Sequence, residues 1–169
     1  MSLRLLPLIC LAFVSVSFAQ QPGSPSAPVP DTCPVTKPGD RPIVPPPPYP
    51  AKAPKGAFWF GTDRLWTLLG KDGVWRGLPH YTPTDPTFRQ KLFWWSQGYD
   101  WKTRPHLTVT GRRLDAPAPP LMADTANGGY QEEDKPFMVV GINLPTLGCW
   151  EITGDYEGDK LSFVVWVTK

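Results

Sequence analysis

Histidine, cysteine and charged residues are all scarce in this chain of 169 residues, and each shortage limits the chemistry that it could perform. His80 and His106 are the only histidines; each follows a proline, and neither lies in an HExxH motif. No Gly-x-Ser-x-Gly elbow, P-loop or dinucleotide-binding fingerprint is present either. The sequence therefore predicts no catalytic residue, no cofactor and no metal site, and it favours a protein that is not an enzyme.

A surplus of either charge is also missing. The chain has 17 basic and 15 acidic residues, whereas binding to nucleic acid or to an anionic membrane surface needs a basic excess. We therefore expect no nucleic-acid partner. The chain length suits one folded domain rather than two.

The longest apolar run, at residues 5–16, is too short to span a bilayer, which needs about 20 residues. Arg4 precedes this run, and the small-x-small sequence Ser17-Phe18-Ala19 follows it, as in a secretory signal peptide. We predict a signal peptide at residues 1–19, cleaved after Ala19, and a secreted or periplasmic protein that does not span the membrane. A lipoprotein signal with Cys10 as the lipidated residue is the alternative, although a small residue is missing just before that cysteine.

Cleavage would remove one of the three cysteines and leave Cys33 and Cys149. Two thiols in an oxidising compartment predict a disulfide. In the chain-entropy model, closing so long a loop stabilises the fold by roughly 4 to 5 kcal/mol.

Residues 20–56 form a proline-rich arm with 13 of the 23 prolines. Proline fixes one backbone dihedral angle and removes a hydrogen-bond donor, so neither a helix nor a sheet can run through this segment. Polyproline II or disorder is expected. We interpret the arm as a stiff spacer that Cys33 partly ties down, or alternatively as a docking site for a proline-binding groove.

Residues 57–169 alternate between short apolar stretches and turn residues, which is typical of an all-β domain. A strand at 65–69 and one at 74–78 flank Lys71-Asp72-Gly73, which predicts a hairpin between them. A long polar, proline-rich loop is expected at residues 115–135. The other expected strands lie at residues 58–60, 90–97, 107–114 and 137–144, before a final pair.

The final pair of strands, within residues 144–167, has the clearest pattern. Gly158-Asp159 predicts a tight turn that places Glu157 opposite Lys160. Alternation then puts Trp150 and Ile152 on an apolar face and Cys149 on the opposite, polar face. We therefore predict that the disulfide pins the arm to the outside or end of the sheet. About seven short antiparallel strands make an immunoglobulin-like β-sandwich at residues 57–169 the expected fold.

The segment at residues 145–154, Pro-Thr-Leu-Gly-Cys-Trp-Glu-Ile-Thr-Gly, and the later Leu-Ser-Phe-Val-Val at 161–165 show a resemblance. The chain resembles small secreted bacterial proteins of no assigned function that end in such a hairpin. Phe58-Trp59-Phe60-Gly61 belongs to the same pattern. The resemblance implies an immunoglobulin-like sandwich and an exported protein, and it implies no activity.

Tryptophan is abundant, with eight residues, and not all of them are easily buried together. Trp94 and Trp95 must point to opposite faces of their strand, so one faces outward from a sandwich. We predict ligand contacts at Trp94, Trp95, Trp101 and Tyr99, as a protein interface or a sugar-stacking platform. We favour the interpretation that the arm or the 115–135 loop covers these rings, and the ligand contacts are the second hypothesis. Arg112 is a further candidate ligand residue, because one of Arg112-Arg113 is expected to pair with Asp115 and the other to face out.

These observations favour a secreted, non-enzymatic binding or structural module of the bacterial cell envelope. Its partner would be an envelope protein or a polysaccharide. The alternative is a polysaccharide-binding module or glycan hydrolase that uses paired carboxylates such as Asp63, Asp100 or Asp115. A self-associating structural protein is a third possibility.

Overall fold

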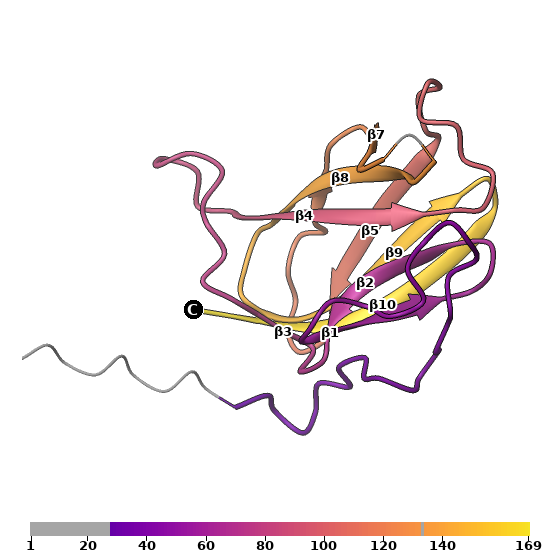
Figure 1. Ribbon diagram of the computed structural model, residues 1–169. Helices are drawn as coiled ribbons and strands as arrows, with labels where there is room; N and C mark the ends of the chain where they lie inside the picture. The colour runs from indigo at the N-terminus through magenta and orange to yellow at the C-terminus, as the bar shows by residue number, and fades with distance from the viewer. Residues whose placement is uncertain (1–27, 133) are drawn as a thin grey trace, which may run out of the picture.

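The computed structural model describes residues 28–132 and 134–169, so the predicted signal peptide and Cys10 lie outside the described residues. Within that part of the chain there are ten strands and no helix, hence none that could span a membrane. The strands form two sheets that pack face to face (Figure 1). The prediction of an immunoglobulin-like β-sandwich is confirmed, with more strands than the seven or so expected.

The larger sheet has six strands in the order β1-β2-β4-β8-β6, and β7 also pairs with β8. Its first three strands carry adjacent apolar residues, such as Phe58-Trp59-Phe60 in β1, and since side chains alternate along a strand, both faces of this part of the sheet are apolar. The strands are β1 (Ala57–Gly61), β2 (Trp66–Gly70), β4 (Phe88–Trp95), β6 (Met122–Ala123), β7 (Asn127–Tyr130) and β8 (Pro136–Leu144).

The smaller sheet has four strands in the order β3-β10-β9-β5. Its long central hairpin joins β9 to β10, and β3 pairs with β10 in parallel. The strands are β3 (Val74–Arg76), β5 (Leu107–Arg113), β9 (Gly148–Tyr156) and β10 (Asp159–Thr168).

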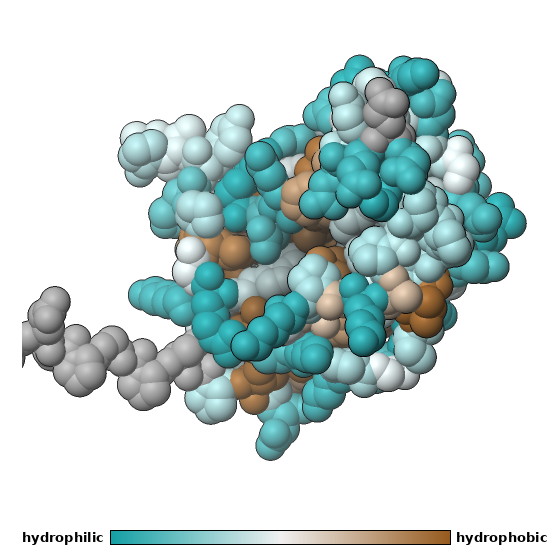
Figure 2. All heavy atoms as spheres, in the orientation of Figure 1, coloured by the Kyte–Doolittle hydropathy of each residue, from teal (hydrophilic) through white to brown (hydrophobic). Residues whose placement is uncertain are grey.

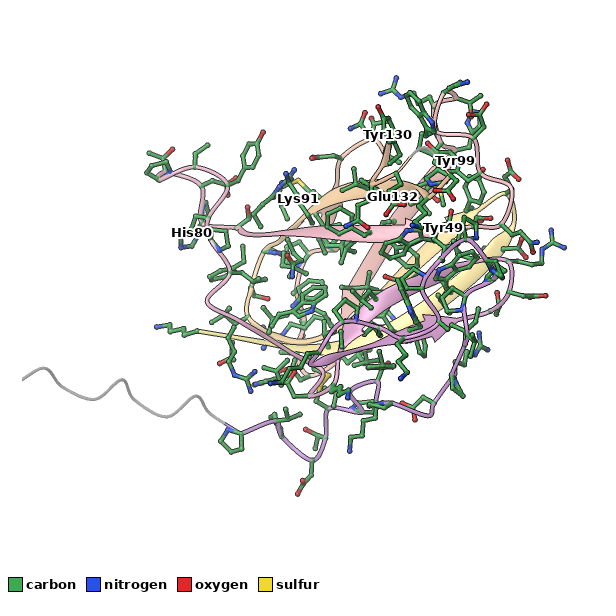
Figure 3. The ribbon with its side chains drawn as sticks, in the orientation of Figure 1. Tyr49, His80, Lys91, Tyr99, Tyr130 and Glu132 are labelled. Carbon is green, nitrogen blue, oxygen red and sulfur yellow. A yellow bond between two sulfur atoms is a disulfide. The ribbon has the colours of Figure 1, made fainter. Side chains whose placement is uncertain are left out.

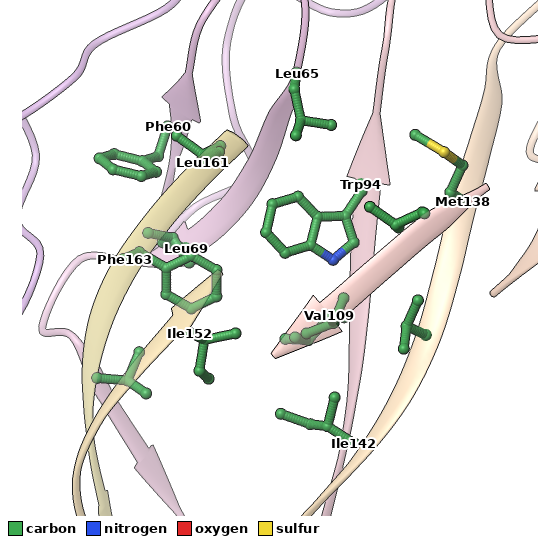
Figure 4. Packing of buried hydrophobic residues seen from close by; sticks show 14 of the residues in the cluster. Phe60, Leu65, Leu69, Trp94, Val109, Met138, Ile142, Ile152, Leu161 and Phe163 are labelled. Carbon is green, nitrogen blue, oxygen red and sulfur yellow. The ribbon is translucent and has the colours of Figure 1, made fainter. Parts of the chain in front are cut away.

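The core lies between the two sheets, and Trp94 stands at its centre (Figure 4). Trp94 is fully buried and packs against Phe163 of the opposite sheet, with ring centroids 5.8 Å apart. A Cβ at Gly154 would lie 2.6 Å from the indole ring, so glycine there makes room for the large side chain. The core therefore depends on one tryptophan facing one glycine across the sandwich.

The register of the final hairpin differs from the prediction. The turn is Glu157-Gly158, with φ of 53° and 90°, and Tyr156 pairs with Asp159. The predicted turn at Gly158-Asp159 is therefore wrong. Positive φ at both Glu157 and Gly158 makes these two residues the centre of a type I′ turn, and the twist of such a turn matches the twist of the two strands that it joins. The pairing shifts by two residues, so the same side chains face inward, since side chains alternate with a period of two.

Two other expectations about the strands are wrong. The residues Lys71-Asp72-Gly73 do not close a hairpin, because β3 leaves the first sheet and pairs with β10 in the second. Residues 115–135 are not simply a loop, because β6 and β7 both pair with β8. Both features come from long-range pairing, which local turn signals do not reveal.

The described part of the arm, residues 28–56, wraps around the sandwich and is not a free spacer (Figure 1). Cys33 forms a disulfide with Cys149, and the bridge packs beside Val164 and Trp166, in a small cluster separate from the main core. This confirms the predicted disulfide and its place outside the core. Beyond it, Thr36 exchanges hydrogen bonds with Val164, which holds the arm on the smaller sheet.

Candidate functional site

The outward face of the larger sheet is as aromatic as its inward face. Trp59 pairs with Leu68 and Trp66 pairs with Trp95, so these side chains share the face that points away from the core. None of the four belongs to the main core cluster between the sheets. A sheet that is apolar on both faces needs a second covering layer, or it presents a binding surface.

The arm supplies part of that layer. The Tyr49 ring meets Trp66 edge-on, with centroids 5.4 Å apart, and its hydroxyl donates a hydrogen bond to the Pro136 carbonyl at 2.8 Å. The indole N–H of Trp59 donates to the Pro50 carbonyl at 3.0 Å. Trp66 is completely buried as a result. Tyr49 thus reaches from the arm to the larger sheet (Figure 3).

Beside the arm the same face stays open and forms a cavity of about 340 Å³, which we call the aromatic groove. Phe93 is 42% exposed there, a large value for an aromatic side chain on a sheet. Hydrophobic side chains also reach the surface between hydrophilic loops on the molecular face shown in Figure 2. The groove is lined by Tyr49, Pro50, Pro54, Trp59, Leu68, Phe93, Trp95, Gln131, Lys135 and Phe137.

The aromatic rings of the groove support one another. Trp95 meets Trp59 edge-on at 5.1 Å and stacks with Phe93 at 6.4 Å, and Phe93 meets Phe137 at 5.5 Å. Edge-to-face and offset pairs of this kind are favourable and fix ring orientation. The groove is therefore already formed without a ligand.

Few charges act on the groove. Burial, with a smaller effect from Asp134, raises the pKa of Tyr49 to about 12, so this phenol is neutral at physiological pH. A hydrogen bond to Glu132 raises the pKa of Lys135, whose ammonium group is held by that carboxylate. The groove thus offers mainly apolar contact, with Gln131 and Lys135 at its border.

The two adjacent tryptophans occupy different environments. Trp94 is fully buried in the core, so it presents no surface to a ligand, whereas Trp95 is half-buried and lines the groove. The expectation that one of them faces outward is confirmed. Only Trp95 of this pair is available as a contact residue.

The other three predicted contact residues lie elsewhere. Tyr99 is buried against Tyr156 and donates a hydrogen bond to the Thr103 carbonyl. Trp101 packs on Tyr130 with ring centroids 4.4 Å apart. Arg112 is on the outer face of the smaller sheet and pairs with Glu151 at 2.7 Å. The structure therefore does not gather the five predicted residues into one site.

Two of the carboxylates that a hydrolase would use, Asp115 and Asp63, lie in separate places and have other partners or neighbours. Asp115 pairs with Arg113 at 2.7 Å, as the sequence suggested, and the hydrogen bonds from Arg113 lower its pKa. Asp63 lines a polar hollow with Glu157 and Asp159, and Arg64 bonds to Asp159. Among the described residues, no tryptophan lines this hollow and no group of three side chains is arranged to hold a metal ion.

Histidine takes no part in the groove. The Nδ1 atom of His80 lies 3.0 Å from the Thr87 carbonyl, in a loop far from Tyr49 (Figure 3). His106 is an exposed residue just before β5.

Sequence reasoning missed Trp59, Leu68 and Phe137 as groove residues. The usable signal was alternation, which places Phe93 and Trp95 on one face of β4. Alternation within one strand does not predict the order of the strands in the sheet, and it is this order that brings β1, β2 and β8 close to β4. A surface built by four strands is not visible in any one of them.

The fold and the groove together define an immunoglobulin-like β-sandwich with an arm bound by a disulfide and an aromatic outer face. Comparison with protein-family models, with curated proteins and with solved structures found no match to this chain.

Proposed function

We propose that this chain is a secreted, non-enzymatic binding module of the bacterial cell envelope, and that it holds a protein partner in the aromatic groove. The observation that carries the proposal is the preformed, open cluster of rings around Phe93 and Trp95. Interfaces are enriched in such aromatic anchors, whereas a monomer otherwise tends to cover them.

The compartment is part of the proposal. The Cys33–Cys149 disulfide is compatible with an oxidising extracellular or periplasmic environment. The apolar start of the sequence, followed by a small-x-small site, supports export through a cleaved signal peptide.

A protein partner suits the groove better than a polysaccharide does. Sugar rings need polar partners for their hydroxyl groups, as well as a ring to stack on. The border of the groove supplies Gln131 and Lys135, but Glu132 engages Lys135 and the Tyr49 hydroxyl already bonds to Pro136. Apolar side chains of a protein would fill the groove, and a backbone carbonyl of the same segment would accept a hydrogen bond from the Trp95 indole N–H.

The test is site-specific photo-crosslinking in cells that produce the protein. A photoreactive phenylalanine analogue replaces Phe93 in the groove or, as a matched control, Thr110, which is exposed on the smaller sheet. We expect a discrete crosslinked protein from position 93 that is absent from position 110 and is lost when Trp95→Ala is added. Equal crosslinking at both positions, or none at position 93, would overturn the proposal.

A further inference from the structure

The chain already shows how the outer aromatic face holds a peptide, because its own arm is bound there. The bound segment follows four consecutive prolines and includes Tyr49 and Pro50. Trp59 donates its indole N–H to the Pro50 carbonyl at 3.0 Å, and Trp66 provides a ring against which Tyr49 packs. The contact therefore combines an indole donor, a proline carbonyl and flat aromatic surfaces.

That combination is matched to proline-rich chains for a physical reason. Proline has no backbone N–H, so an extended proline-rich segment offers carbonyl acceptors and ring surfaces rather than a ladder of donors. Grooves that bind such segments are lined by aromatic rings, and the stiffness of the ligand lowers the entropy lost on binding.

The open part of the face continues the occupied part. Trp59, which binds the arm, touches Trp95 edge-on at 5.1 Å, and Trp95 leads on to Phe93. Among the described residues, the indole N–H of Trp95 has no hydrogen-bond partner and does not belong to the buried unpaired side-chain atoms, whereas the indole N–H of Trp66 does. The open half thus repeats the elements of the occupied half, a ring surface and an indole donor.

Residues 28–56, the described part of the arm, do not fill the open half. After Pro50 the chain passes Pro54 at the border of the groove and enters β1 at Ala57. No residue of the described part of the arm beyond Tyr49, Pro50 and Pro54 lines the groove, so the open half has room for a further ligand.

We propose that the aromatic groove binds an extended, proline-rich segment of a partner protein, which lies beside the arm and places a carbonyl oxygen on the Trp95 indole. This inference rests on the function proposed above and specifies the chemistry of the ligand. The occupied half of the face provides the argument, because it is continuous with the open half and has the same chemistry.

The experiment is an NMR titration of the mature, disulfide-bonded protein with ¹⁵N-labelled indoles. The probe is a capped peptide of two Pro-Pro-Pro-Tyr-Pro repeats, the sequence found at residues 46–50. A control peptide has serine in place of every proline. The Trp95 indole signal is assigned from its absence in Trp95→Phe, a variant that keeps an aromatic ring but removes the donor.

We expect a saturable shift of the Trp95 indole signal with the proline peptide and none with the serine peptide. Phe93→Ala should weaken binding by about tenfold or more, as is usual for a central interface aromatic. Trp101→Ala, which changes a ring outside the groove, should leave the affinity unchanged. Phe93 is 42% exposed and does not belong to the core cluster, so its removal leaves the core intact and the variant remains informative.

Three results would overturn the inference. They are no saturable shift with the proline peptide, equal binding of the serine peptide, and binding of the proline peptide that survives Phe93→Ala.

Other ligands give other outcomes. If a glycan or an acyl-chain detergent saturates the same indole signal and the proline peptide does not, the groove binds that ligand instead. A concentration-dependent dimer that Phe93→Ala dissociates would assign it to a second copy. A crosslinked partner at position 93 together with no peptide binding would leave the proposed function standing and reject only the proline-rich ligand.

Discussion

Trp94 and Trp95 are neighbours in sequence with opposite environments, so their removal should have unequal effects. Trp94 is completely buried, and replacing a buried tryptophan by alanine costs about 3 to 5 kcal/mol. Trp95 is half-buried on the outer face, and since Trp95→Ala removes its contacts with Trp59 and Phe93, we expect a cost of about 1 to 2 kcal/mol. Urea denaturation of both variants measures the difference. Similar losses would contradict the assignment of the two faces.

Asp115 links the end of β5 to the disulfide, because it accepts hydrogen bonds from Arg113 and from the backbone N–H of Cys149. Arg113 is the main reason that the pKa of Asp115 is lowered. A carboxylate with a lowered folded-state pKa stabilises the fold above its unfolded pKa, and that stability is lost as the pH falls through the folded value.

We therefore expect Asp115→Asn to destabilise the protein by about 1 kcal/mol at neutral pH, a modest value because the pair contacts solvent. The difference from wild type should shrink below the unfolded pKa of about 4 and vanish below the folded value. Denaturation at several pH values tests this. A difference that stays constant down to low pH would show that the charge is not its cause.

At the scale of elements, the β9–β10 turn offers a test of the hairpin register. Glu157 has a φ of 53°, a left-handed conformation that a side chain disfavours, and Gly158 has a φ of 90°. Since Asn-Gly is the preferred type I′ pair, Glu157→Asn should stabilise the protein by roughly 0.5 to 1 kcal/mol. Gly158→Ala should destabilise it by about 1 kcal/mol or more. Thermal denaturation of both variants measures these changes, and a turn at Gly158-Asp159 would give no gain from Glu157→Asn.

At the scale of the whole molecule, the arm joins the two sheets from outside. Cys33 and Thr36 hold it on the smaller sheet, and Tyr49 and Pro50 hold it on the larger one. The arm is thus part of the sandwich and forms one wall of the groove.

The double variant Cys33→Ala with Cys149→Ala should lower the free energy of unfolding by up to about 4 to 5 kcal/mol, because the closed loop in the unfolded chain is long. Unfolding of the oxidised wild type, the reduced wild type and the double variant measures it. The reduced wild type and the double variant should have the same free energy of unfolding. Unchanged stability in the double variant would mean that the arm contacts alone hold the arm in place.

Much of the fold could be predicted from local patterns. The faces of β9 and β10 were predicted correctly although the pairing was displaced by two residues, because an even shift preserves which side chains face inward. The parallel pairing of β3 and the strands β6 and β7 were missed, because they depend on partners far away in the sequence.

The candidate site was predictable only in part. Trp95 was identified because alternation forces one of two adjacent tryptophans outward, and Trp94 was included because alternation does not say which one. Trp59 and Phe137 join the groove through the strand order of the larger sheet.

The sequence by itself therefore determined the all-β class, the faces of the final hairpin and the pairing of Cys33 with Cys149. These features follow from side-chain period, turn residues and the count of thiols, which are properties of neighbouring residues or of composition. Tertiary structure alone decided that Tyr49 and Pro50 of the arm dock on the outer face of the larger sheet and that four strands build an aromatic groove beside them. Such features require contacts between distant segments, and the burial of apolar surface that selects those contacts acts on the whole chain at once.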